Sequence, residues 1–233
     1  MTQASARPHG LVVDWGGVLT TGIGDAFGAW AAAEGIDYGH YLAVLKTWIG
    51  PDAVDPATNP MHALERGELE VPDFEQRLAQ ALSEHGSRVR AEGLLRRMFA
   101  GLELAEESMV GLVRRAKAAG LRTALLSNSW GNDYPREGWD TMFDAVVISG
   151  EVGMRKPEHR IYHHVLERLG LSPSEAVMVD DLQPNLAAAV EVGMVGVLHR
   201  SYDETLVELE AVFGIELGTD AEAALEAERR AGS

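Results

Sequence analysis

The chain has 233 residues, of which 46% are hydrophobic and 24% are charged, as is typical of a globular protein with a buried core. This composition excludes a disordered chain, a collagen-like chain and a very small domain that depends on disulfides. Asp and Glu outnumber Lys and Arg by 36 to 20, and the formal net charge is −16. Because so acidic a surface repels nucleic acids and anionic lipids, we expect neither as a partner.

The chain contains no cysteine, which excludes disulfides, thiolate catalysis and Cys-zinc sites. A cysteine-free composition favours a reducing compartment. The first ten residues lack the apolar stretch of a signal peptide. The uncharged run between Asp14 and Asp25 is shorter than the roughly 20 apolar residues that span a bilayer. We therefore expect a soluble cytoplasmic protein with no membrane partner.

Short apolar runs alternate with helical patterns in most of the chain. Between Met109 and Ala116 an apolar residue recurs every three or four positions, which predicts a helix. Strand–helix alternation with short links predicts an α/β fold: a Rossmann-like, mostly parallel sheet with helices on both faces. The predicted strands are residues 11–13, 123–126, 145–148, 177–179 and 195–198.

Residues 21–101 interrupt this alternation, with helical patterns and no convincing buried strand. We expect a helical insert that lies over one edge of the sheet. The predicted division is a core of residues 1–20 plus 105–218, an inserted helical unit of residues 21–104, and a tail of residues 219–233. The tail is rich in Ala, Glu and Arg without a wide apolar face, which predicts a solvated terminal helix or a frayed end.

Polar side chains follow the predicted strands, and in an open parallel sheet ligands bind beyond the carboxyl ends of the strands. Three carboxylates near one point repel each other, and Mg²⁺ is the usual counter-charge. A hydroxyl, an amide and an ammonium suit phosphate oxygens, and a carboxylate can attack phosphorus. The residues are Asp14 after the first strand, Ser127 and Asn128 after the second, Lys156 shortly after the third, and Asp180 and Asp181 after the fourth.

Each of these residues also has an ordinary structural explanation. A single Asp after a strand is more often a turn or cap residue, and Asp180 and Asp181 could cap a helix that starts at Pro184. Lys156 is more informative because the chain otherwise favours Arg, whose planar guanidinium does not replace a compact ammonium at a tight phosphate site. Together, at successive strand ends, the residues favour a site for phosphate and metal.

Four segments, residues 12–20, 126–128, 154–158 and 177–181, resemble the four signature motifs of the haloacid dehalogenase superfamily, in the same order. The helical insert lies where that superfamily has a small cap subdomain, and the resemblance covers all but the C-terminal tail. Residues 153–162, with Glu65-Arg66-Gly67-Glu68 in the insert, are most similar to the bacterial branch that includes a glucose-1-phosphate phosphatase. The N-terminal phosphatase domain of soluble epoxide hydrolase is also similar.

The resemblance implies a Mg²⁺-dependent hydrolase. It makes Asp14 the nucleophile that forms an aspartyl-phosphate, and Lys156 the cation that neutralises charge in the transition state. It also implies a cap that closes the site and selects the leaving group. The remaining implied roles are phosphoryl binding by Ser127 and the amide region of Asn128, and metal binding by Asp14, the Gly16 carbonyl, Asp181 and, directly or through water, Asp180.

Gly16 departs from the usual pattern, since most phosphatases of the superfamily carry a general acid/base Asp two residues after the nucleophile. Losing a general acid typically costs about 10²–10⁴-fold in rate where the leaving group needs a proton. The similar glucose-1-phosphate phosphatase branch also carries Gly at this position. Gly16 therefore favours a slow enzyme, one whose acid is water or a cap residue, or a non-catalytic relative.

Three functions remain open. The first is a Mg²⁺-dependent phosphatase acting on a small phosphorylated metabolite, with a sugar phosphate as one candidate. The second is a metal-independent 2-haloacid dehalogenase, which the pair Asp180 and Asp181 opposes. The third is a weakly catalytic binding or regulatory protein. Gly16 favours this function, and the intact Asp14, Lys156 and Asp181 oppose it. The sequence leaves the physiological substrate and the oligomeric state open.

Overall fold

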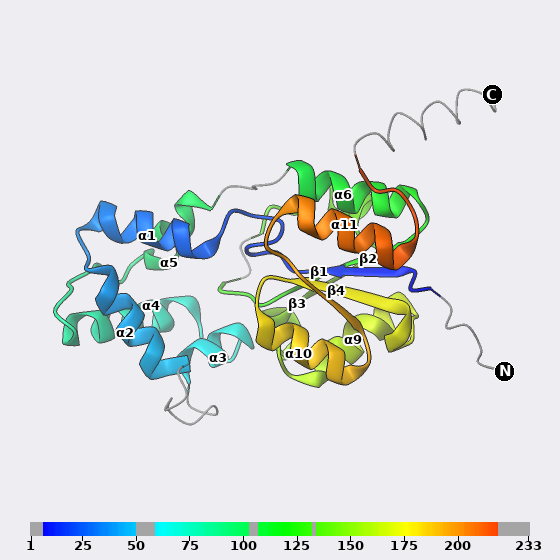
Figure 1. The fold of residues 1–233 in the computed structure, drawn as a ribbon. Coiled ribbons are helices and arrows are strands. Elements are labelled where there is room, and N and C mark those ends of the chain that lie inside the picture. Colours follow the sequence, from blue (N-terminus) through cyan, green and yellow to red (C-terminus); the bar gives the residue numbers. More distant parts are fainter. Residues whose placement is uncertain (1–6, 50–58, 103–106, 132–133, 219–233) are drawn as a thin grey trace.

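The computed structural model describes residues 7–49, 59–102, 107–131 and 134–218, so the predicted tail, residues 219–233, lies outside it. Its centre is a parallel sheet with the strand order β3-β2-β1-β4-β5 (Figure 1). This confirms the predicted α/β fold, and it places β1 in the middle with β2 and β4 on either side. The strands are β1 (Gly10–Val13), β2 (Arg122–Ser127), β3 (Ala145–Ile148), β4 (Ala176–Asp180) and β5 (Val195–Leu198).

Helices cover both faces of the sheet (Figure 1). Along β1, Leu11 and Val13 belong to the apolar cluster on one face and Val12 to the cluster on the other. A strand buried on both faces has to be apolar throughout, which explains its continuous apolar run. One face carries α6 (Glu107–Ala118), α7 (Trp139–Met142) and α11 (Tyr202–Phe213), and the other carries α9 (His159–Leu169) and α10 (Gln183–Val192).

Two short elements complete the core, α8 (Ser149–Val152) after β3 and the 3₁₀ helix η2 (Pro173–Glu175) before β4. α10 starts directly beyond β4, with Pro184 in its first turn, where the missing N–H of proline costs no helical hydrogen bond. This start brings Asn185 to the carboxyl end of β4. Within the described part of the chain, no helix is long and apolar enough to cross a membrane.

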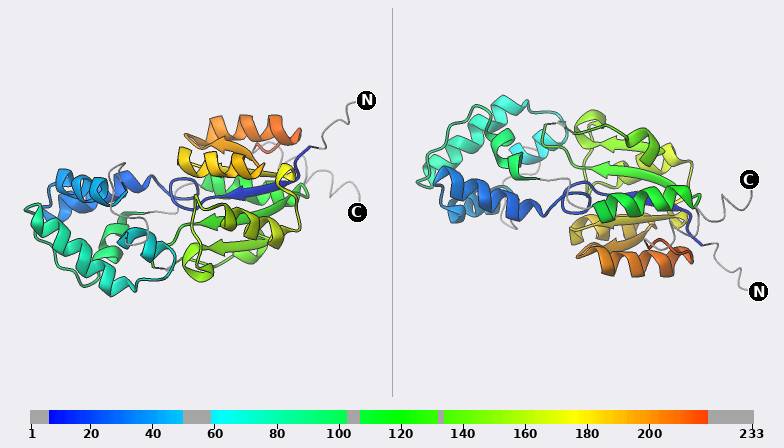
Figure 2. Two further views of the ribbon diagram at one scale, coloured as in Figure 1. Left: turned by 90° about the horizontal axis from the view of Figure 1, so that it is seen from below. Right: turned by 90° about the horizontal axis from the view of Figure 1, so that it is seen from above.

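Between β1 and α6 the chain forms a helical unit beyond the carboxyl ends of the strands (Figures 1 and 2). We call this unit the cap. Its helices pack around an apolar cluster of their own, separate from the two clusters of the sheet, which supports our proposal that residues 21–104 form a distinct unit. The elements are α1 (Ile23–Glu34), α2 (Tyr38–Ile49), α3 (Pro60–Glu65), α4 (Val71–Glu84), α5 (Leu94–Met98) and the 3₁₀ helix η1 (Phe99–Gly101).

The cap contacts the core through the turn after α3. Gly67 has a φ of +70°, and a Cβ at this position would lie 2.6 Å from the carbonyl oxygen of Gly150. Next to it, the Ser149 hydroxyl donates to the Glu65 carbonyl oxygen, and Arg66 forms an ion pair of 3.3 Å with Glu158. Position 67 therefore requires glycine for its backbone conformation and for the close approach of the core.

Replacing Gly67 with alanine tests this contact. Gly67→Ala and Gly35→Ala both place a side chain at positive φ, at a cost of about 1–2 kcal/mol. At Gly35, with a φ of +68°, the new Cβ meets no described atom within 4 Å, whereas at Gly67 it meets a backbone carbonyl. We expect Gly67→Ala to lower the free energy of unfolding by about 1 kcal/mol or more beyond Gly35→Ala, measured in urea. Equal losses would contradict a tight contact at position 67.

Candidate active site

The carboxyl ends of the central strands bring the predicted polar residues together around Lys156. Asp14 follows β1, Ser127 ends β2 and Asp180 ends β4. The ammonium of Lys156 lies 2.8 Å from Asp14 Oδ1 and 2.6 Å from Asp180 Oδ2, and its side chain is only 1% exposed. Since a buried charge is costly without partners, the two carboxylates and the ammonium stabilise one another.

Backbone and side-chain donors orient both carboxylates. Asp14 Oδ1 also accepts a hydrogen bond of 2.7 Å from the Trp15 N–H. Asp180 Oδ1 accepts from the Leu182 N–H at 2.9 Å. The side-chain amide of Asn185 donates to both Asp180 oxygens, at 3.0 and 3.1 Å. Asn185 was not among the predicted site residues, although its position in the first turn after the Asp pair was a usable signal.

Asp14, Asp180 and Asp181 form an acidic cluster. One carboxylate oxygen from each lies within 4.8 Å of the other two. The loop after β1 approaches this cluster closely: at Gly17, which has a φ of +78°, a Cβ would lie 2.5 Å from Asp181 Oδ2. Gly16 lines the same cavity as Asp14 and Asp181. A set of carboxylate and carbonyl oxygens is the donor set that a hard divalent cation prefers, so the residues present fit Mg²⁺.

The charges in this cluster are not balanced by Lys156 alone. Burial raises the pKa of Asp14 to about 7; Lys156 opposes the rise and Asp180 adds to it. Burial and the charge of Asp180 raise the pKa of Asp181 to about 6. Burial alone would lower the pKa of Lys156, but Asp14 and Asp180 outweigh it and raise that pKa above its usual value. A bound divalent cation would favour the ionised carboxylates.

Ser127 and Asn128 lie at the same edge of the sheet, but their side chains differ in what they contact. The Ser127 hydroxyl is hydrogen-bonded to the Tyr134 hydroxyl at 2.9 Å. The side chain of Asn128 pairs with the backbone of Lys156: its Nδ2 donates to the Lys156 carbonyl at 3.0 Å, and its Oδ1 accepts from the Lys156 N–H at 2.8 Å. The side-chain amide of Asn128 therefore holds the backbone that carries Lys156.

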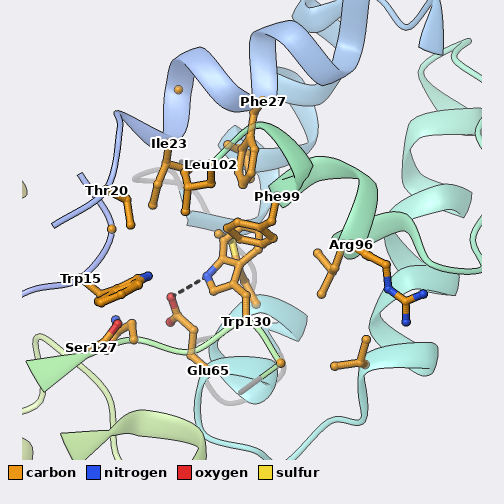
Figure 3. A pocket seen from close by; sticks show the side chains of 18 of the residues that line it. Trp15, Thr20, Ile23, Phe27, Glu65, Arg96, Phe99, Leu102, Ser127 and Trp130 are labelled. Carbon is orange, nitrogen blue, oxygen red and sulfur yellow. Dashed lines mark hydrogen bonds between the residues drawn. The ribbon is translucent and has the colours of Figure 1, made fainter. Parts of the chain in front are cut away.

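Glu65 of α3 brings a buried carboxylate from the cap to the site (Figure 3). It accepts hydrogen bonds from Arg155 Nε and, at 3.4 Å, from Trp130 Nε1, which is the dashed line in Figure 3. Burial raises the pKa of Glu65, and Arg155 opposes that rise. The sequence analysis named Glu65 only as part of a segment that resembles a family branch, not as a site residue. Its partner Arg155 lies 90 residues further along the chain, so no local pattern indicates the pair.

A family model described as haloacid dehalogenase-like hydrolase matches residues 8–193. The chain belongs to this family. It is therefore a hydrolase of the haloacid dehalogenase type, and the predicted resemblance to this superfamily is confirmed. Asp14 directly follows the central strand β1, and Lys156 contacts its carboxylate where the strand ends meet.

Two curated relatives are informative. The chain is 33% identical over 155 residues to a sesquiterpene phosphatase of Aspergillus oryzae, covering 64% of this chain and 77% of that protein. It is 35% identical over 109 residues to bifunctional epoxide hydrolase 2 of Sus scrofa, covering 43% of this chain. That second match takes in only 20% of the larger protein, so the chain spans a small part of such relatives.

Solved structures share the fold at low sequence identity. A predicted HAD-like family hydrolase from Porphyromonas gingivalis aligns with a TM-score of 0.62 at 20% identity, covering 88% of this chain and 98% of that one. A HAD family enzyme from Bacteroides thetaiotaomicron, solved with magnesium and inorganic phosphate, aligns with a TM-score of 0.56 at 19% identity, covering 83% of this chain and 94% of that one.

The ion pair of Glu65 with Arg155 predicts a stability effect. The side chains of this pair are 8% and 15% exposed, so Glu65→Ala leaves a largely buried guanidinium without its carboxylate. We expect the free energy of unfolding to fall by about 2 kcal/mol or more. Glu151→Ala is the control, since Glu151 and its partner Arg136 are 39% and 48% exposed, and its expected loss is below about 1 kcal/mol. Urea unfolding of both variants checks this, and equal losses would contradict it.

Proposed function

We propose that the protein is a Mg²⁺-dependent phosphatase that hydrolyses a small phosphomonoester through an aspartyl-phosphate on Asp14. The observation that carries this proposal is the contact of the Lys156 ammonium with Asp14, beside a cluster of carboxylates at the carboxyl edge of the sheet. Similarity to a sesquiterpene phosphatase supports phosphate-ester chemistry. The proposed partner is a phosphorylated metabolite, and the proposed location is the cytoplasm.

Mg²⁺ would be held by the carboxylates of Asp14 and Asp181 and the backbone carbonyl of Gly16. Asp180 already accepts hydrogen bonds from Asn185 and Lys156 on its two oxygens, so we propose that it acts through water. When bound, the ion polarises a phosphoryl oxygen and offsets the negative charge of the site. The similar enzyme from Bacteroides thetaiotaomicron, solved with magnesium and phosphate, supports this choice of ion.

The proposed reaction has two displacements. A carboxylate oxygen of Asp14 attacks phosphorus, the ester P–O bond breaks, and the alkoxide leaves and takes up a proton. Water then attacks the phosphorus of the aspartyl-phosphate, which releases inorganic phosphate and restores the Asp14 carboxylate. Lys156 stabilises the charge that develops between Asp14 and the phosphoryl group, while Ser127 and the backbone amide of Asn128 bind phosphoryl oxygens.

Gly16 influences which esters react fastest, because no carboxyl stands two residues after Asp14. The proton for the leaving alkoxide has to come from water or from another side chain. An aryl ester such as p-nitrophenyl phosphate hardly needs this proton, so its hydrolysis tests the rest of the site without a general acid. The acidic cluster favours the phosphatase over a metal-independent dehalogenase, because displacement of halide by Asp14 does not require further carboxylates.

Asp14→Asn is expected to lower the rate of p-nitrophenyl phosphate hydrolysis by more than about a thousandfold, since an amide is a poor nucleophile towards phosphorus. The fold is expected to persist, because Asn has nearly the same shape. Asp140→Asn, at an exposed position of α7, is the matched control and should keep full activity. Near-normal turnover in Asp14→Asn would remove this residue as the nucleophile.

Metal removal provides a second test. EDTA is expected to abolish p-nitrophenyl phosphate hydrolysis, and excess Mg²⁺ to restore it. Binding at 100 times the Kd adds about 2.7 kcal/mol to stability, so Mg²⁺ should also raise the Tm by several degrees. Asp181→Asn should lose this rise, whereas Asp203→Asn, exposed on α11, should keep it. Hydrolysis that survives EDTA would refute the metal dependence.

A further inference from the structure

A cavity of about 1800 Å³ extends from the site into the cap. At one end it is lined by the catalytic candidates Asp14 and Lys156 together with Ser127. Pockets for small ligands typically measure about 300–1,000 Å³, so this cavity is larger than a compact metabolite phosphate requires. The space beyond the phosphate end is therefore available to the alcohol part of a substrate.

One wall of this space is apolar, although the cavity lining also includes Tyr38, His62 and Gln76. Figure 3 shows Ile23, Phe27, Phe99 and Leu102 from the cap gathered around Trp130, beside the end of the cavity marked by Trp15 and Ser127. Aromatic contacts join the two units: the ring centroid of Trp130, in the loop after β2, lies 5.8 Å from those of Phe27 and Phe99. Around Trp130, residues of the cap and the core thus form one apolar wall.

The buried carboxylates along this wall are already used by the protein. Glu65 accepts from Arg155 and Trp130. Glu75 accepts from the backbone N–H groups of Gly93 and Leu95, at 3.0 and 2.9 Å. Arg96 lies on the opposite side of the view in Figure 3 from Trp15 and Ser127. The hydroxyl groups of a sugar placed against this wall would lose their hydrogen bonds to water and face hydrocarbon.

We infer that the substrate of the proposed phosphatase is the monophosphate of an apolar alcohol, whose hydrocarbon part lies against Ile23, Phe99, Leu102 and Trp130. This inference rests on the proposed function for the position of the phosphate. The acidic cluster and Lys156 bind the charged end, and the cap wall binds the hydrocarbon end. An amphiphile with one charged end and one long apolar end matches both parts of the cavity.

The property to vary is the length of the ligand's alkyl chain. Each buried methylene contributes about 0.8 kcal/mol to binding, which is about a fourfold gain in affinity. The probes are butyl-, hexyl- and octylphosphonate with Mg²⁺ present, and the readout is the Kd from titration calorimetry. Phosphonates have no ester bond to hydrolyse, so this measurement is independent of turnover. We expect the Kd to fall more than about tenfold from butyl- to octylphosphonate. The same Kd for all three would overturn the inference.

Turnover of octyl phosphate and glucose 1-phosphate complements the binding measurement. We expect a higher kcat/KM for octyl phosphate, and a higher value for glucose 1-phosphate would overturn the inference. If no ester is hydrolysed, p-nitrophenyl phosphate included, while phosphonate binding still depends on chain length, the phosphatase proposal fails and the apolar binding site stands. The two proposals can therefore fail separately.

Leu102→Gln tests where the alkyl chain of the ligand binds. Leu102 is only partly buried and Gln has a similar volume, so the fold should persist while the wall becomes polar. We expect the Kd ratio between butyl- and octylphosphonate to shrink at least about fivefold. Ile23→Thr is a second variant of the same wall, with the same expectation. Val207→Gln, 66% exposed on α11, is the control and should keep the full ratio. An unchanged ratio in both wall variants would refute the proposed binding surface.

Discussion

A buried ammonium between two carboxylates determines the arrangement of the site. Lys156 contacts Asp14 at the end of β1 and Asp180 at the end of β4, so one ion-paired cluster joins two neighbouring strands and the loop after α8. Each of the three charges is stabilised by its partners, because a buried charge without a partner is costly. Their surroundings reflect this, because Asn128 holds the backbone of Lys156 and Asn185 holds both oxygens of Asp180. The catalytic candidates are thus fixed before any substrate arrives.

Core and cap contribute different chemistry to one cavity. The core provides charged and polar groups at the carboxyl ends of parallel strands, where backbone geometry gathers them. The cap provides aromatic and aliphatic surface, and it is tied to the core by Glu65 with Arg155 and by the close contact at Gly67. Substitutions in the cap wall can therefore alter the preferred alcohol without changing the residues that contact phosphorus. Because Gly16 provides no general acid, the rate of hydrolysis also depends on how much the leaving group needs a proton.

Much of the fold was predictable from local pattern. The runs 145–148 and 195–198 coincide with β3 and β5, because short continuous apolar runs are typical of strands in a parallel sheet with helices on both faces. The meeting of Asp14, Lys156 and the Asp pair was predictable because strand ends in a parallel sheet share one edge. Asn185, Tyr134 and Glu65 were not predicted as site residues. Asn185 carried a local signal, its position just after the Asp pair, but Tyr134 and Glu65 matter through contacts that local spacing does not reveal. Glu65 reaches Arg155 across 90 residues of sequence, and no local spacing encodes that distance.

The sequence by itself determined the family, the alternation of strands and helices, and which residue types stand at the strand ends. These features depend on neighbours a few positions apart, through the periods of helix and strand. Only the tertiary structure decided how Asn128 and Asn185 orient the charged groups, and which side chains form the wall of the cavity. That wall combines Ile23, Phe99 and Trp130, which belong to separate segments. Side chains so far apart in the chain become one surface only when the cap packs against the core.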